Sequence, residues 1–179
     1  GRAVVLFTSH AQLKAVYKQI REPLAQSGVT VLAHGISGGP SHLLARLKKE
    51  KNCCILGANS FWEGIDVVGS ALAMVIVVRL PFWPPNTPVM AARLQKMEQE
   101  GINGFQTYSL PQAIIRFKQG FGRLIRSAED IGVFCVLDRR IFEKFYGRAF
   151  RQALPDMHLT QGNAREIGQE IREWLGEEE

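Results

Sequence analysis

Two arginines and a glutamine stand at spacings that would suit a phosphate group. Gln119, Arg123 and Arg126 recur at i, i+4 and i+7, so a helix running to about residue 125 would present all three on one face. Two guanidinium groups on one face can clamp phosphate oxygens through paired N–H donors. The alternative is that the cations only favour the negative end of the helix dipole. The segment predicts either an anion site or an ordinary helix end.

A second polar group lies in the loop that follows residue 58. This loop carries two carboxylates, Glu63 and Asp66, beside Gly64. A carboxylate here could accept a hydrogen bond from a ribose hydroxyl, or hold a water molecule or an arginine. The alternative is an Asx-type turn, in which Asp66 bonds its own backbone.

The hydrophobic pattern predicts the elements that position these residues. Short apolar runs alternate with helix-like segments, which indicates an α/β fold with a mostly parallel sheet and helices on both faces. We expect strands at 4–8, 29–33, 53–56, 74–78 and 132–137, the fourth central and the fifth buried. We expect helices from about 10 until Pro23 intervenes, from a cap at Ser41, and over 89–99, 109–125, 141–150 and 164–175.

Ligands of such sheets bind outside the carboxyl ends of the strands. The loops that begin there should therefore share one edge, and they start at Thr8, His34, Gly57, Arg79 and Asp138.

Charge is unevenly distributed along the chain. The 179 residues carry a net charge of +5, but residues 1–150 hold 19 Lys and Arg against 10 Asp and Glu, whereas residues 151–179 hold 3 against 7. A basic body predicts a polyanionic partner, such as nucleic acid or nucleotide phosphates. The alternative is a surface whose charge only keeps the protein soluble.

Several function classes are disfavoured. The sequence has no G-x-x-x-x-G-K-[ST] phosphate loop, G-x-G-x-x-G, G-x-S-x-G or H-E-x-x-H motif, so a self-contained hydrolase or oxidoreductase is not expected. The apolar run 71–78 is far shorter than the ~20 residues of a membrane span. Three cysteines, two of them adjacent, indicate a reducing compartment. No leader precedes the first strand pattern, so we expect a cytoplasmic protein and a fragment of something larger.

Together these segments resemble a known family. F-W-E-G-I-D-V-V-G at 61–69 is similar to motif V of superfamily 2 helicases, Q-G-F-G-R-L-I-R-S at 119–127 to motif VI, and L-F-T-S at 6–9 to motif IV. L-P-F-W-P-P at 80–85, L-P-Q-A at 110–113 and Asp138-x-Arg140 are similar to the DinG/XPD-like branch. The resemblance covers residues 1–150 and implies the C-terminal, RecA-like motor domain, the one that lacks the phosphate loop. We treat 151–179 as a helical extension of the same domain.

The resemblance also implies roles for residues that hydrolyse ATP. Such motors cleave ATP, with Mg²⁺, in a cleft shared with an N-terminal helicase domain that is missing here. Arg126 would be the arginine finger, Arg123 a second phosphate contact and Gln119 the residue that positions the phosphate or the attacking water. Glu63, Gly64 and Asp66 would belong to the cofactor site, and Gly64 and Asp66 would also couple the cleft to the nucleic acid and approach the ribose or Arg123.

Further roles concern nucleic acid. Thr8, Ser9, Asn59 and Ser60 would bond the backbone of single-stranded DNA, and Phe82 or Trp83 could stack on a base. Any iron–sulfur cluster of the family would belong to the missing part, with none in this chain.

The sequence thus predicts the second motor domain of a bacterial, nucleoid-associated, monomeric DNA helicase that moves 5′ to 3′ and is inactive without its N-terminal domain. Two alternatives stay open. One is the motor part of a helicase-derived nuclease, and the other is a nucleotide- or nucleic-acid-binding module without unwinding activity.

Overall fold

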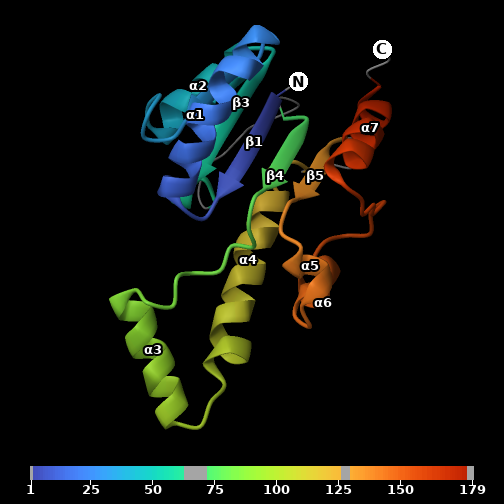
Figure 1. Cartoon of the computed structure of the whole chain (residues 1–179). Helices are drawn as coiled ribbons and strands as arrows, with labels where there is room; N and C mark the ends of the chain where they lie inside the picture. Colours follow the sequence, from blue (N-terminus) through green and yellow to red (C-terminus); the bar gives the residue numbers. More distant parts are fainter. Residues whose placement is uncertain (1, 63–71, 126–129, 177–179) are drawn as a thin grey trace.

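The computed structural model of the chain describes residues 2–62, 72–125 and 130–176 (Figure 1). The strands are β1 Arg2–Phe7, β2 Thr30–Ala33, β3 Cys53–Ala58, β4 Met74–Val77 and β5 Val133–Val136. The helices are α1 His10–Gln26, α2 Pro40–Lys49, the 3₁₀-helix η1 Asn59–Phe61, α3 Pro88–Gln99, the π-helix η2 Phe105–Ser109, α4 Leu110–Phe121, α5 Arg140–Glu143, α6 Gly147–Gln152 and α7 Ala164–Leu175. All five expected strands are confirmed.

The five strands form one parallel sheet in the order β2-β3-β1-β4-β5. Strand β1 therefore occupies the centre, while β4, which we expected there, lies between β1 and β5. The prediction of a buried β5 is wrong, because its four residues are only half-buried. Within the described residues β5 pairs with β4 alone, so its other edge has no neighbouring strand.

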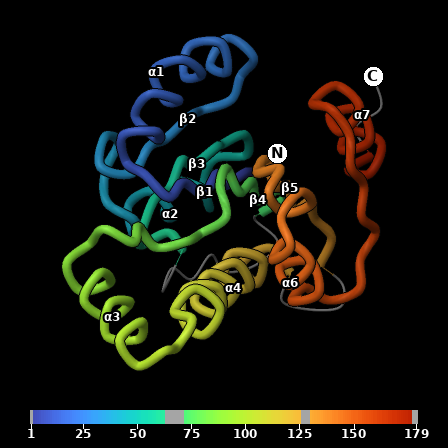
Figure 2. The backbone as a smooth tube through the Cα atoms, turned by 60° about the horizontal axis from the view of Figure 1, so that its bottom comes forward, coloured from blue at the N-terminus to red at the C-terminus, as the bar shows by residue number. Residues whose placement is uncertain are grey.

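Helices cover both faces of the sheet, which confirms the predicted α/β fold. Alternate residues of β1 point to opposite faces: Val4 and Leu6 join the core beneath α2, α4 and α6, whereas Val5 and Phe7 join the core beneath α1. Figure 2 shows α1 on one side of the strands and α4 on the other.

Two helix ends differ from expectation. Helix α4 ends at Phe121 instead of 125, and the backbone N–H of Gly122 caps it by donating to the carbonyl of Lys118. Glycine has a high entropic cost in a helix, so a helix readily ends there. Helix α1 continues through Pro23 to Gln26, because this proline is exposed near the last turn, where water can replace the lost backbone bond.

Two further expectations are corrected. Helix α2 begins at Pro40, and proline is favoured in the first turn of a helix. Its N-cap residue is Gly39, which makes no side-chain capping bond, so Ser41 lies inside the helix and does not cap it. Residues 141–150 form the two short helices α5 and α6 instead of one. The chain folds back between them, and Gly147 packs so closely that a Cβ there would lie 2.2 Å from the carbonyl oxygen of Ile141.

Helix α3 and the start of α4 project away from the sheet on the side of the strands' carboxyl ends (Figure 1). Helix α3 contacts the segment that leads into α4: the guanidinium of Arg93 lies 4.6 Å from the ring centroid of Tyr108 in η2, and Leu94 packs against Gly104, which precedes η2. The hairpin therefore has contacts of its own outside the main core.

Candidate functional site

The carboxyl ends of β1 and β3 bring four predicted residues to one edge. Phe7 pairs with Ala58 at the end of the ladder, so Thr8 and Ser9 lie beside Asn59 and Ser60. The Ser9 side chain accepts a hydrogen bond from the backbone N–H of Gln12 (3.4 Å) and so caps α1.

The two pairs at this edge differ in exposure. Asn59 and Ser60 are exposed, whereas Thr8 and Ser9 are half-buried. Asn59 adopts φ +50°, a left-handed conformation that asparagine tolerates better than most residues. This turn allows the chain to leave β3 directly into η1, with the polar pair on the outside.

Trp62 is the point at which β1, the loop after β3 and α4 meet. The ring is fully buried, and its Nε1 donates to the carbonyl of Phe7 at 2.8 Å. Helix α4 approaches it closely at Gly120, where a Cβ would lie 3.3 Å from Trp62 Cζ3 and 3.2 Å from Leu6 Cδ1. Gly120 thus lets α4 pack against the ring and against β1.

Arg123 connects the end of α4 to the same tryptophan. Its side chain is buried (8% exposed), and Nη2 donates to the Trp62 carbonyl at 2.8 Å. Because α4 ends at Phe121, Arg123 lies in the turn beyond the helix, so the expectation that it shares one helical face with Gln119 is wrong. Gln119 is exposed on the last turn. Arg126 lies outside the described residues.

The motif V loop begins directly after Trp62. Its predicted residues Glu63, Gly64 and Asp66 lie outside the described residues. The contact between Arg123 and the Trp62 carbonyl nevertheless joins the segment that resembles motif VI to the first residues of the segment that resembles motif V.

The proline-rich loop after β4 separates two aromatic side chains. Phe82 is half-buried and packs against Phe105, Tyr146 and Phe150 at centroid distances of 5.4–5.8 Å. Trp83 is 41% exposed, so of the two rings only Trp83 is accessible to a base.

A buried arginine holds the inner side of this loop. The guanidinium of Arg116 on α4 lies 4.0 Å from the ring centroid of Trp83 and 5.7 Å from that of Trp62. Its Nη1 donates to the carbonyl of Pro81 at 3.3 Å, and the residue is only 5% exposed. Arg116 therefore links the loop of Trp83 to the buried junction at Trp62.

Asp138 fixes the start of the same loop at Leu80, one residue before Pro81. Its carboxylate accepts from the backbone N–H of Leu80 (2.9 Å) and from the Arg140 guanidinium. Burial alone would raise the pKa of Asp138, but the hydrogen bonds from Arg140 and Leu80 outweigh it and hold the pKa below its usual range. The side chain is charged at neutral pH and anchors the loop.

The cysteines are structural in character. Cys53 and Cys54 are buried in β3, and burial raises the pKa of their thiols to about 11 and about 12. In the described residues no group of three or more His, Cys, Asp or Glu side chains is placed to hold a metal ion.

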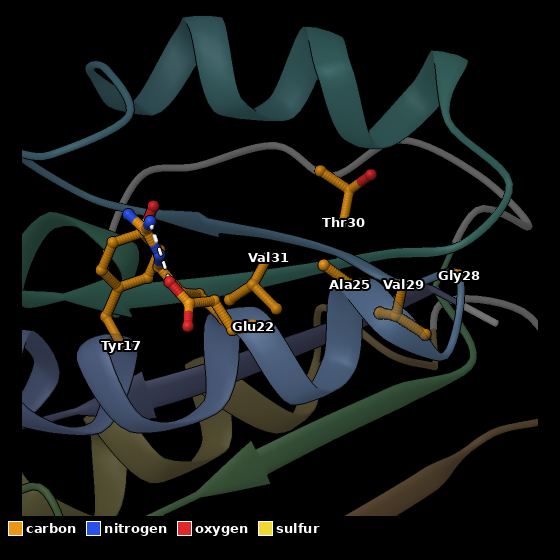
Figure 3. Close-up of a pocket in the computed structure, with 8 residues that line it drawn as sticks. Tyr17, Glu22, Ala25, Gly28, Val29, Thr30 and Val31 are labelled. Carbon is orange, nitrogen blue, oxygen red and sulfur yellow. Dashed lines mark hydrogen bonds and ion pairs between the residues drawn. The ribbon is translucent and has the colours of Figure 1, made fainter.

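One open hollow of about 460 Å³ lies away from this edge (Figure 3). It is lined by the end of α1 and the start of β2, including Tyr17, Glu22 and Thr30. It therefore sits at the amino end of β2, opposite the strand ends that carry the polar residues. None of the described helices is long and apolar enough to cross a membrane.

The class of the protein follows from a sequence match over most of the chain. Residues 1–157 match the family described as the helicase C-terminal domain, and the chain belongs to this family, in its DinG/XPD-like branch. The fold resembles a solved XPD helicase with a TM-score of 0.62 at 22% identity, over 89% of this chain and 29% of that one. A structure of Xpd4 from S. tokodaii gives a TM-score of 0.55 at 18% identity, over 83% of this chain and 28% of that one.

Curated relatives include two named helicases and one named nuclease. The chain is 44% identical over 167 residues to the 3′-5′ exonuclease DinG of Bacillus subtilis, 36% over 167 residues to the ATP-dependent DNA helicase YoaA of Escherichia coli, and 34% over 172 residues to the ATP-dependent helicase DinG of Mycobacterium tuberculosis. These matches cover 93%, 93% and 96% of the chain but only 18%, 26% and 25% of the relatives. The chain thus spans about a quarter or less of each.

Sequence reasoning missed two residues of the site, Trp62 and Arg116. In the sequence Trp62 stood out only as part of the segment that resembles motif V, and the hydrophobic periodicity did not predict that its ring is buried. Arg116 lies three residues before Gln119, on the inner face of α4, and a charge within an apolar helix face was the available signal.

Proposed function

We propose that this chain is the second motor domain of an ATP-dependent DNA helicase that moves 5′ to 3′ on single-stranded DNA. The observation that carries the proposal is the junction at Trp62. The buried Trp62 ring donates to the end of β1 and packs on α4, and the backbone carbonyl of the same residue accepts a hydrogen bond from Arg123. If nucleotide binding displaced the end of α4, Trp62 would therefore transmit the displacement to the carboxyl end of β1, which would face the nucleic acid.

The nucleotide-side roles follow from the family resemblance. Arg126 would reach the γ-phosphate from this domain, and exposed Gln119 would position the phosphate or the attacking water. Arg123, besides the phosphate contact that the resemblance implies, would hold the motif V loop through the Trp62 carbonyl. Bound ATP, with its Mg²⁺, would supply the free energy of phosphoanhydride cleavage.

An N-terminal domain would complete this nucleotide site. It would supply the phosphate loop, the Mg²⁺ carboxylates and any iron–sulfur cluster. The isolated chain is therefore expected to be inactive. Residues 1–150 would act as the motor domain, with 151–179 as its helical extension.

The nucleic-acid side is a polar track at the strand ends. Thr8, Ser9, Asn59 and Ser60 would bond phosphodiester oxygens without reading sequence, and Trp83 would stack on a base. Polar edge residues and an exposed ring suit single-stranded DNA. The full protein would act as a cytoplasmic, nucleoid-associated monomer.

A second candidate function is the motor part of a nuclease. It is favoured by one observation, the 44% identity to a relative named an exonuclease. In that case ATP and the motor domain would serve a nuclease located elsewhere in the full protein.

One experiment separates these functions. The full-length protein is given duplex DNA with either a 5′ or a 3′ single-stranded tail, with and without ATP. Our proposal predicts ATP-dependent release of an intact strand from the 5′-tailed duplex. Shortened strands would favour the nuclease, and release only from the 3′-tailed duplex would refute the proposed direction.

A further inference from the structure

Two histidines lie side by side at the strand ends, next to the proposed DNA track. His10 is the first residue of α1, directly after Thr8 and Ser9, and His34 directly follows β2. Their ring centroids are 5.1 Å apart. His34 also lies 5.2 Å from the ring of Phe61, and its Nδ1 is 3.2 Å from the Ala58 carbonyl. The imidazoles therefore form a row across the ends of β1, β3 and β2.

Among the described residues, a lysine and a third histidine lie near this row. Lys14 lies one turn along α1 from His10, and His42 of α2 packs against Gly38 in the loop that returns beside His34. The described part of β3 and η1 contributes Ala58, Asn59, Ser60 and Phe61, none of which titrates. Within the described residues neither His10 nor His34 forms an ion pair with a carboxylate.

The electrostatics agree with this geometry. The pKa of His10 is lowered by burial first, and then by the nearby His34 and Lys14. A protonated His10 is disfavoured chiefly by burial, and within the described residues no carboxylate forms an ion pair with it. An anion placed beside the pair would reverse that, since it would favour the charged form.

We propose that His10 and His34 bind a phosphate group of single-stranded nucleic acid, and that this contact takes up protons. The inference rests on the proposed function and adds a site to it. A neutral imidazole has one N–H, and that of His34 lies on Nδ1 and faces the Ala58 carbonyl, so His34 can donate to a phosphate through Nε2 only when it is protonated. Below about pH 6.5 a bound phosphodiester would stabilise the imidazolium form, whose hydrogen bonds to the phosphate are charge-assisted.

The sign and size of the effect follow from proton linkage. A phosphate that raises the pKa of an imidazole must bind more tightly as the pH falls through that pKa. One pKa unit corresponds to at most about a tenfold change in affinity. We expect Kd to fall about three- to tenfold between about pH 8 and about pH 6.

The experiment measures binding of the full-length protein to fluorescent oligo(dT) at fixed ionic strength and at both pH values. Thymine bases do not titrate in this range, so the pH response reports the protein. The variants are His10→Gln, His34→Gln and both together. The control is His158→Gln, which removes an exposed histidine near Glu170, far along the chain.

The wild type and the control should bind more tightly at low pH, whereas the double variant should lose that gain and keep most of its affinity at high pH. An unchanged pH response in the double variant would overturn the inference. Absence of oligo(dT) binding by the wild type at both pH values would instead overturn the proposed function.

A second measurement uses only the wild type, in case the double variant fails to fold. Calorimetric titration with oligo(dT) at about pH 6, in two buffers of different ionisation enthalpy, counts the protons taken up on binding. The inference predicts net uptake of up to about two protons, one per imidazole. Zero uptake would contradict it.

Discussion

The contact between Arg116 and Trp83 should contribute measurably to the stability of the domain. A cation–π pair contributes about 0.5–1 kcal/mol at an exposed site and about 2 kcal/mol when desolvated. The guanidinium lies 4.0 Å from the ring centroid and Arg116 is 5% exposed, but Trp83 is 41% exposed. The pair is thus desolvated on one side only, and we expect a coupling free energy of about 1–1.5 kcal/mol.

A double-mutant cycle isolates this coupling. Arg116→Met keeps most of the aliphatic stem and removes the charge, while Trp83→Leu keeps an apolar side chain without the ring. Urea unfolding of the wild type, both single variants and the double variant gives four free energies of unfolding. Their non-additivity is the coupling free energy, so the hydrogen bond from Arg116 to Pro81, absent from both Arg116→Met proteins, largely cancels.

The pair of Arg21 and Tyr17, with 6.0 Å between the guanidinium and the ring centroid, provides a control. Its cycle, with Arg21→Met and Tyr17→Leu, should give about 0.5 kcal/mol or less, because Arg21 is exposed and remains hydrated. A coupling below about 0.3 kcal/mol for Arg116 and Trp83, within the usual error of additivity, would refute the view that the arginine holds the loop.

Two other changes test the packing and the loop anchor. Gly57→Ala should lower the free energy of unfolding by about 1–3 kcal/mol, since the new Cβ would lie 2.3 Å from Phe61 Cγ. Gly168→Ala in α7 should raise the free energy of unfolding by about 0.5–1 kcal/mol, since a Cβ there would meet no atom within 4 Å. Equal thermal shifts for both variants would contradict this. The folded pKa of Asp138 is depressed, so its stabilisation is complete above the unfolded value of about 3.9 and is lost as the pH falls through the lower folded value. Asp138→Asn should therefore be less stable at neutral pH and lose less stability on acidification than the wild type; parallel pH profiles in urea unfolding would reject the anchor.

The fold was largely predictable because each strand is a short apolar run between polar loops. Parallel strands buried on both faces leave that pattern directly in the sequence. Strand β5 was misjudged since its composition is that of a buried strand, and only the sheet order shows that among the described strands it has a single neighbour. The end of α4 was misjudged because periodicity continues through Arg123, although the backbone has already left the helix at Gly122.

The site was predictable only where it lies on strand ends. That the loops carrying Thr8, Ser9, Asn59 and Ser60 share one edge follows from the rule that parallel strands end together, whereas their contact with nucleic acid is implied only by the family resemblance. The inward turn of Arg123 toward the Trp62 carbonyl was not predictable, because it depends on where α4 packs against β1. The same holds for Arg116, whose partners lie 33 and 54 residues away in the sequence.

The central claim is that this domain completes an ATP site through Arg126. The most direct test is single-strand-stimulated ATP hydrolysis by the full-length protein, with nucleotide affinity measured separately and Arg165→Ala in α7 as the control. The account predicts that Arg126→Ala lowers the hydrolysis rate by about 10³-fold or more while ATP still binds and the control remains active. Normal turnover by Arg126→Ala would contradict it.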